Sequence, residues 1–85
     1  MTHSYKTRGT CARQIDFELE NGIVKNVSFF GGCNGNLKGI GALVEGKPAE
    51  EVIPLLKGIK CGFKPTSCPD QLAQALEVAL NDENK

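Results

Sequence analysis

Residues 12–30 read ARQIDFELENGIVKNVSFF, and this stretch decides the fold. Residues 12–20 alternate between apolar and polar side chains, which is typical of a half-buried strand. The pair Asn21-Gly22 follows, and it favours a tight hairpin turn because both residues tolerate a positive φ. A second apolar strand is expected over residues 23–30, with a bulge near Lys25-Asn26, where the alternation is imperfect. The stretch therefore predicts an antiparallel hairpin.

The segments on either side of this hairpin predict one more strand and the first two helices. Residues 5–10 are a candidate third strand. After the hairpin, apolar residues recur at helical spacing over residues 37–44, and Gly46 is expected to end that helix. A short helix should begin at Pro48, be kinked or split by Pro54 and stop at Gly58. Glycines are costly inside a helix, so those of the first helix indicate that a backbone or a ligand approaches it closely: Gly35, Gly39 and Gly41.

The last helix is expected to begin within residues 66–70 and to bury one apolar face, formed by Leu72, Ala75, Leu76, Ala79 and Leu80. We expect a single domain over residues 1–85, with mobile ends at about residues 1–4 and 81–85. Its fold class is α+β: a small antiparallel sheet of two or three strands packed against two or three helices. A chain this short buries only about 60–65% of its unfolded surface, so its core is thin.

The composition excludes several classes of function. Ten basic residues balance ten acidic ones, which argues against a broad nucleic-acid-binding face. No apolar run approaches the roughly 20 residues that a membrane span requires. The first residues contain no apolar stretch typical of a secretory signal, so we expect a cytoplasmic protein. In that reducing compartment, clustered cysteines more often bind metal or do redox work than form structural disulfides.

Four cysteines are the candidate functional residues: Cys11, Cys33, Cys61 and Cys68. Cys33 and Cys68 each stand where a helix is expected to begin, and a helix N-terminus favours thiolate over thiol. Thiolate is the form that ligates metal or attacks a disulfide. The spacing contains no Cys-x-x-Cys pair, so it leaves open that some of the four are ordinary buried, inert cysteines.

Two resemblances bear on these cysteines, and the first is literal. Residues 66–70 spell TSCPD, the signature of the TSCPD domain, and the segments 23–33 and 58–61 also resemble that family. The match covers nearly the whole chain and resembles the stand-alone, four-cysteine branch. The same domain occurs at the C-terminal end of adenosylcobalamin-dependent (class II) ribonucleoside-diphosphate reductases. The resemblance therefore implies an accessory role in ribonucleotide reduction and deoxynucleotide supply, with a reductase catalytic chain as partner.

The resemblance does not imply reductase catalysis by this chain. That chemistry needs a large barrel with a radical cysteine, a redox pair and a cobalamin site, which 85 residues cannot hold. We therefore expect no cobalamin site here, and a chain that is not catalytic alone.

The second resemblance is to the U-type iron–sulfur scaffold proteins, in which three cysteines meet at one cluster or zinc site. Cys11, Cys33 and Cys68 fall on the matching positions, and the resemblance extends to the expected fold. The scaffold's two possible non-cysteine ligands are replaced by Arg13 and Ser67, so Cys61 is the candidate fourth ligand. This resemblance implies zinc or an iron–sulfur cluster as cofactor, and iron–sulfur machinery as a second class of partner.

Other patterns carry less weight. Residues 41–47 fit the start of a phosphate-binding loop but fail at Pro48, where Ser or Thr is needed. His3, the single histidine, is expected to be solvated. Phe29 and Phe30 cannot both face one core, and either Phe30 or Phe63 is a candidate exposed aromatic at a partner surface. Four lysines could form a basic rim that attracts an anion or nucleotide, or simply a solvated surface: Lys38, Lys57, Lys60 and Lys64.

Three functions follow from these observations. The leading hypothesis is a tetrathiolate zinc or iron–sulfur module that stabilises the fold and serves a partner. The second is a redox module in which Cys68 and either Cys61 or Cys33 cycle between dithiol and disulfide. The third is an interaction domain with inert cysteines. We expect a monomer or weak dimer in each case.

Overall fold

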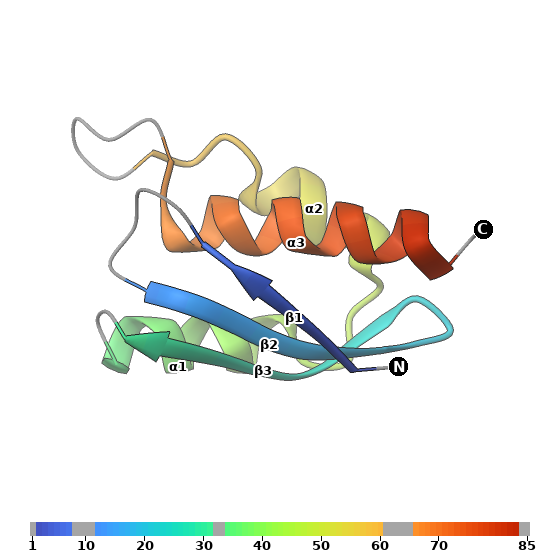
Figure 1. The fold of residues 1–85 in the computed structure, drawn as a ribbon, viewed down its shortest axis with the longest axis horizontal. Helices are drawn as coiled ribbons and strands as arrows, with labels where there is room; N and C mark the ends of the chain where they lie inside the picture. Colours follow the sequence, from blue (N-terminus) through green and yellow to red (C-terminus); the bar gives the residue numbers. More distant parts are fainter. Residues whose placement is uncertain (1, 8–11, 32–33, 61–65, 84–85) are drawn as a thin grey trace.

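The computed structural model describes residues 2–7, 12–31, 34–60 and 66–83 (Figure 1). In this part of the chain three strands form one antiparallel sheet in the order β1-β2-β3, and three helices follow. The elements are β1 (Thr2–Lys6), β2 (Ala12–Glu20), β3 (Ile23–Gly31), α1 (Asn34–Val44), α2 (Ala49–Leu56) and α3 (Cys68–Glu83). The expected α+β class, with its sheet and helices, is confirmed.

The predicted hairpin is confirmed in its strands, its turn and its bulge. Asn21 and Gly22 have φ of 52° and 79°, so both adopt the left-handed conformation that a two-residue hairpin turn requires. The register shifts between Asp16 and Glu18, and Asn26 on the opposite strand also has a positive φ of 53°. One extra residue on β3 therefore interrupts the ladder at the place where the sequence alternation fails.

The third strand begins earlier than the sequence predicts. β1 starts at Thr2 and ends at Lys6, whereas the prediction began at Tyr5; residues 8–10 of the predicted strand lie outside the described residues. Pairing with β2 sets this register, with Tyr5 opposite Ile15 and His3 opposite Phe17. The mixed polarity of the first residues gives no alternation strong enough to reveal this pairing from sequence.

The core lies between one face of the sheet and the helices. Ile15, Phe17 and Leu19 are fully buried, while the alternate residues of β2 are half-buried or exposed. From the other side α3 contributes the apolar face that the sequence predicted, with Leu80 half-buried at its margin: Leu72, Ala75, Leu76 and Ala79. α3 continues to Glu83, beyond the polar tail expected from Asn81, because its last turn needs no apolar contact to stay helical.

The glycines of α1 and the proline of α2 were both expected to affect their helices, and α2 departs from that expectation. Gly41 brings α1 against β3, since a Cβ built there would lie 3.4 Å from the Val27 carbonyl oxygen. This is the close backbone approach expected at a glycine; Gly39 has no such neighbour, and the surroundings of Gly35 fall outside the described part. Pro54 does not split α2, a single short helix. It stands in the last turn, where its missing N–H removes little of the helical ladder.

Among the described helices, none is both long and apolar enough to cross a membrane.

Candidate thiol site at the start of α3

Of the four predicted site residues, the structure describes one. Cys68 is the first residue of α3, and its half-buried side chain is a free thiol. Cys11, Cys33 and Cys61 lie outside the described residues. Within the described ranges, no group of three or more His, Cys, Asp or Glu side chains is placed to hold a metal ion.

The described chain neighbours of these cysteines lie at one end of the molecule. Ala12, next to Cys11, pairs with Gly31, two residues before Cys33. In Figure 1 the start of β2, the end of β3 and the starts of α1 and α3 all lie at the same end of the long axis. The fold therefore brings to one end the elements that border three of the cysteines.

The start of α3 is fixed by a serine cap. The hydroxyl of Ser67 accepts a hydrogen bond from the Asp70 backbone N–H at 3.2 Å, and the Ser67 carbonyl accepts one from the Gln71 N–H at 2.8 Å. Serine is favoured there because its side chain satisfies an N–H group that has no partner within the helix. The cap makes Cys68 the first helical residue.

Asp70 is the centre of a buried hydrogen-bond network at this cap. Only 6% of its surface is exposed, and its carboxylate accepts hydrogen bonds from the Gly58 N–H at 2.7 Å, the Gln74 amide at 2.9 Å and the Thr66 hydroxyl. The Gln71 amide donates in turn to Thr66 at 3.0 Å. All the buried polar residues of the described part belong to the start of α3: Thr66, Ser67, Asp70 and Gln71.

This network ties the end of α2 to the start of α3. The Ser67 hydroxyl donates to the Ile59 carbonyl at 2.6 Å, and Asp70 holds the Gly58 N–H. An exposed ion pair between Lys57 and Glu77, 2.9 Å long, joins the same two segments. Residues 58–59 are thus bonded to residues 67–70, so the two described borders of the segment that carries Cys61 lie together.

The network also controls the ionisation of Asp70. Burial acts to raise the pKa of this carboxyl, but the hydrogen bonds that it accepts from Thr66, Gly58 and Gln74, together with the charge of Lys57, outweigh burial. The pKa is therefore held below its ordinary value, and the carboxylate is charged in the folded protein at neutral pH.

This shift predicts a pH dependence of stability. Because the pKa of Asp70 is lower in the folded than in the unfolded chain, its contribution is fully present at neutral pH. It should be lost progressively as the pH falls below roughly 4. Urea unfolding should show that the free energy of unfolding declines between pH 7 and pH 3. This decline should be smaller in Asp70→Asn. Glu20→Gln is the comparison variant. Lys25 also lowers the pKa of the Glu20 carboxyl, but this carboxyl is exposed, so its replacement should alter the decline less than Asp70→Asn does. An unchanged decline in Asp70→Asn would contradict the prediction.

Most of the other residues singled out from the sequence are placed apart from this cap. His3 stacks on Phe17, with ring centroids 5.4 Å apart, so it packs against the core rather than being simply solvated. Phe30 is half exposed, as one of the two alternatives expected, whereas Phe63 and Lys64 lie outside the described residues. The remaining three lysines, Lys38, Lys57 and Lys60, are all exposed, and of these Lys57 belongs to the segment bonded to the cap.

Sequence reasoning missed the network around Asp70. Ser67 and Asp70 stand three residues apart, as in a capping box, and this pattern could have identified the cap. The bonds to Gly58 and Ile59 could not be found this way, because they depend on how α2 and α3 pack together.

Comparison with known proteins places the chain by family. The family model of the TSCPD domain matches residues 1–80, nearly the whole chain. No curated protein and no solved structure matched it.

Proposed function

The chain belongs to the TSCPD domain family, and we propose that it is a small metal-binding module that holds zinc or an iron–sulfur cluster. The proposed ligands are the thiolates of Cys11, Cys33, Cys61 and Cys68. The observation that carries the proposal is the position of Cys68: a free thiol at a capped helix start, at the end of the molecule where the elements bordering the other cysteines meet.

The chemistry of the donor set supports this assignment. Four thiolates are a common ligand set for structural zinc and for iron–sulfur clusters. Two pairs of bordering residues are in direct contact: Ala12 pairs with Gly31, and Ser67 bonds to Ile59. The first pair borders Cys11 and Cys33, and the second borders Cys61 and Cys68.

In this proposal, the polar network around Asp70 is a positioning device. The cap at Ser67 fixes the backbone of Cys68, and the bonds to Gly58 and Ile59 fix the chain that leads towards Cys61. Zinc bound by four cysteines would have no open coordination position, so it would supply stability rather than chemistry. Thr66, Ser67 and Asp70 of the family signature thus have a structural role around its cysteine.

The cellular role that we propose is accessory to ribonucleotide reduction. It rests on the resemblance to the C-terminal domain of the class II reductases. The partner would be a reductase catalytic chain, with iron–sulfur machinery as the other candidate. We propose that the chain contributes a folded, metal-stabilised module and not the reductase chemistry itself.

Metal analysis of protein purified without oxygen or chelator tests this function. About one zinc, or one iron–sulfur cluster with its visible absorbance, is expected per chain. Cys68→Ala should lose the metal, because three thiolates hold it much less tightly than four. Ser28→Ala is the matched control, since Ser28 is exposed on β3 and should leave the metal content unchanged. Circular dichroism establishes that both variants fold.

Folded wild-type protein without metal and with four freely titrating thiols would refute the metal site. It would favour a dithiol/disulfide module, which the contact between Ile59 and Ser67 also supports, because these residues border Cys61 and Cys68. In that case Cys68 should react rapidly with a thiol reagent in the folded protein, and oxidation should protect two thiols together.

A further inference from the structure

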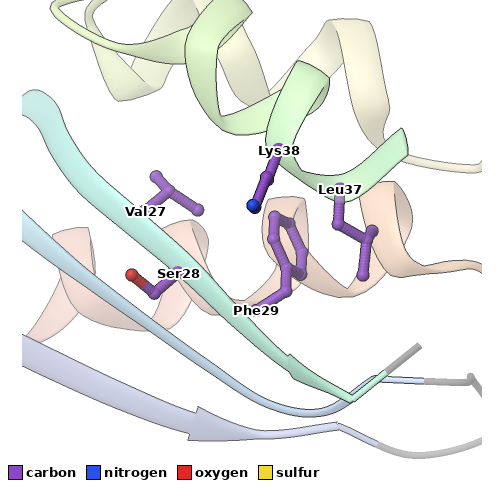
Figure 2. Close-up of a pocket in the computed structure, with 5 residues that line it drawn as sticks. All are labelled: Val27, Ser28, Phe29, Leu37 and Lys38. Carbon is purple, nitrogen blue, oxygen red and sulfur yellow. The ribbon is translucent and has the colours of Figure 1, made fainter. Parts of the chain in front are cut away.

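A hollow between β3 and α1 is separate from the cap of α3. α1 approaches the backbone of β3 closely at Gly41, and one helical turn earlier the two elements leave a pocket of about 170 Å³ (Figure 2). The described residues that line it are Val27, Ser28 and Phe29 of β3 and Leu37 and Lys38 of α1. The pocket therefore lies on the N-terminal side of the glycine contact.

The floor of this pocket is apolar and its mouth carries one cation. Leu37 is only 6% exposed, and Val27 and Phe29 are half-buried. Figure 2 shows Leu37 beside the ring of Phe29, with the amino group of Lys38 extending towards that ring. Lys38 is exposed and makes no hydrogen bond or ion pair in the part of the chain that the structure describes. Among the described residues, this charge thus has no partner, and it stands over an apolar surface.

These features define the chemistry of a ligand. An apolar cavity of about 150 Å³ is large enough to bind benzene, so this pocket has room for one six-membered ring or a branched aliphatic group. Lys38 is the single charged group among the described lining residues, and it would pair with one negative charge at the mouth. We propose that the pocket binds a compact apolar group that carries a carboxylate.

Two sources can supply this chemistry: a free aromatic or branched-chain acid, or the C-terminal residue of a peptide. The outer edge of β3 is covered at Val24, which bonds to Lys47 and Gly46. Beyond Val27, whose carbonyl lies against Gly41 of α1, that edge makes no backbone–backbone bond to other described residues, so an extended peptide could pair with the stretch beside the pocket. The two sources differ in whether the strand edge takes part.

Backbone amide NMR with benzoate and benzyl alcohol as probes tests the pocket. Benzoate should shift the amide resonances around Phe29, Leu37 and Lys38 saturably, with a dissociation constant on the order of millimolar. Benzyl alcohol has the same ring without the charge and should bind about two- to fivefold more weakly. The peptide source is tested with acetyl-Gly-Gly-Phe, which carries either a free C-terminal carboxylate or, as the uncharged comparison, an amidated C-terminus. Tighter binding of the free-carboxylate peptide than of benzoate would identify a peptide source, and weaker binding a free acid.

Lys38→Gln is the decisive variant, because an exposed residue can be changed without disturbing the core. It should weaken the binding of benzoate about two- to fivefold and leave the binding of benzyl alcohol unaffected. Lys47→Gln, a change at another exposed lysine, is the control and should bind benzoate as the wild type does. The proposal would be overturned by any one of three results: no saturable shift with benzoate or with the free-carboxylate peptide, equal affinity for benzoate and benzyl alcohol, or unchanged benzoate binding by Lys38→Gln. The experiment does not depend on a metal, so its outcome is independent of the thiol site.

Discussion

Replacing Asp70 by Ala is expected to lower the free energy of unfolding by about 2–4 kcal/mol, since hydrogen bonds to a charged group contribute about 1.5–3 kcal/mol each and are not additive. The substitution leaves three donors without their acceptor: the Gly58 N–H, the Thr66 hydroxyl and the Gln74 amide. A domain is stable by only about 5–15 kcal/mol, so this loss would be a large fraction of the whole. It would also release the end of α2 from the start of α3.

Urea unfolding at neutral pH measures this loss. Glu50→Ala is the control, because Glu50 is an exposed acid in the first turn of α2 and should cost no more than about 1 kcal/mol. Asp70→Asn removes the charge but keeps the shape of the side chain. It keeps one acceptor oxygen, but its NH₂ group then faces the N–H donor of Gly58 or of Gln74. It should therefore also destabilise. A change in Asp70→Ala no larger than in Glu50→Ala would contradict the role given to the network.

The parts of the fold with strong local patterns could be predicted from the sequence. The alternation around Ile15 and Phe17 and the pair Asn21-Gly22 specify the hairpin, because strand period and turn conformation are local properties. The apolar spacing of Leu72 and Leu76 likewise specified the buried face of α3. In each case a few neighbouring residues carry enough information without knowledge of the partner element.

The features that the sequence did not reveal depend on contacts between distant segments. β1 takes its register from β2, and its own residues show no clear alternation. α3 continues to Glu83 because helix ends depend on small energy differences, and α2 stays a single helix although the sequence places the costly Pro54 inside it.

The candidate site likewise has one feature that local sequence predicted and others that it did not. The prediction that Cys68 stands at a helix start follows from local sequence, and the structure confirms that position. The bonds from Asp70 to Gly58 and from Ser67 to Ile59 were not predicted, because they link residues that are eight to twelve positions apart through the packing of two helices. Whether the four thiols meet at one metal stays a prediction.

Removal of the proposed metal is expected to destabilise the protein more than Asp70→Ala does. A ligand that binds only the folded chain adds about 4 kcal/mol of stability when its free concentration is a thousand times its dissociation constant, and structural zinc commonly exceeds this. For a domain of this size, about 1 kcal/mol corresponds to a change of roughly 4–8 °C in the midpoint of thermal unfolding. Excess chelator should therefore lower the midpoint by at least about 15 °C.

The measurement is a thermal unfolding curve with and without chelator, under reducing conditions. The reductant matters because it removes any disulfide, so a large chelator effect in its presence must come from metal bound to thiolates. Cys68→Ala should already unfold at the lower temperature and should not respond to chelator, whereas Ser28→Ala should respond as the wild type does. Identical curves for the metal-loaded and chelator-treated wild type would show that the fold does not depend on metal. The core between β2 and α3 would then suffice for stability, and the thiols would be free for redox work.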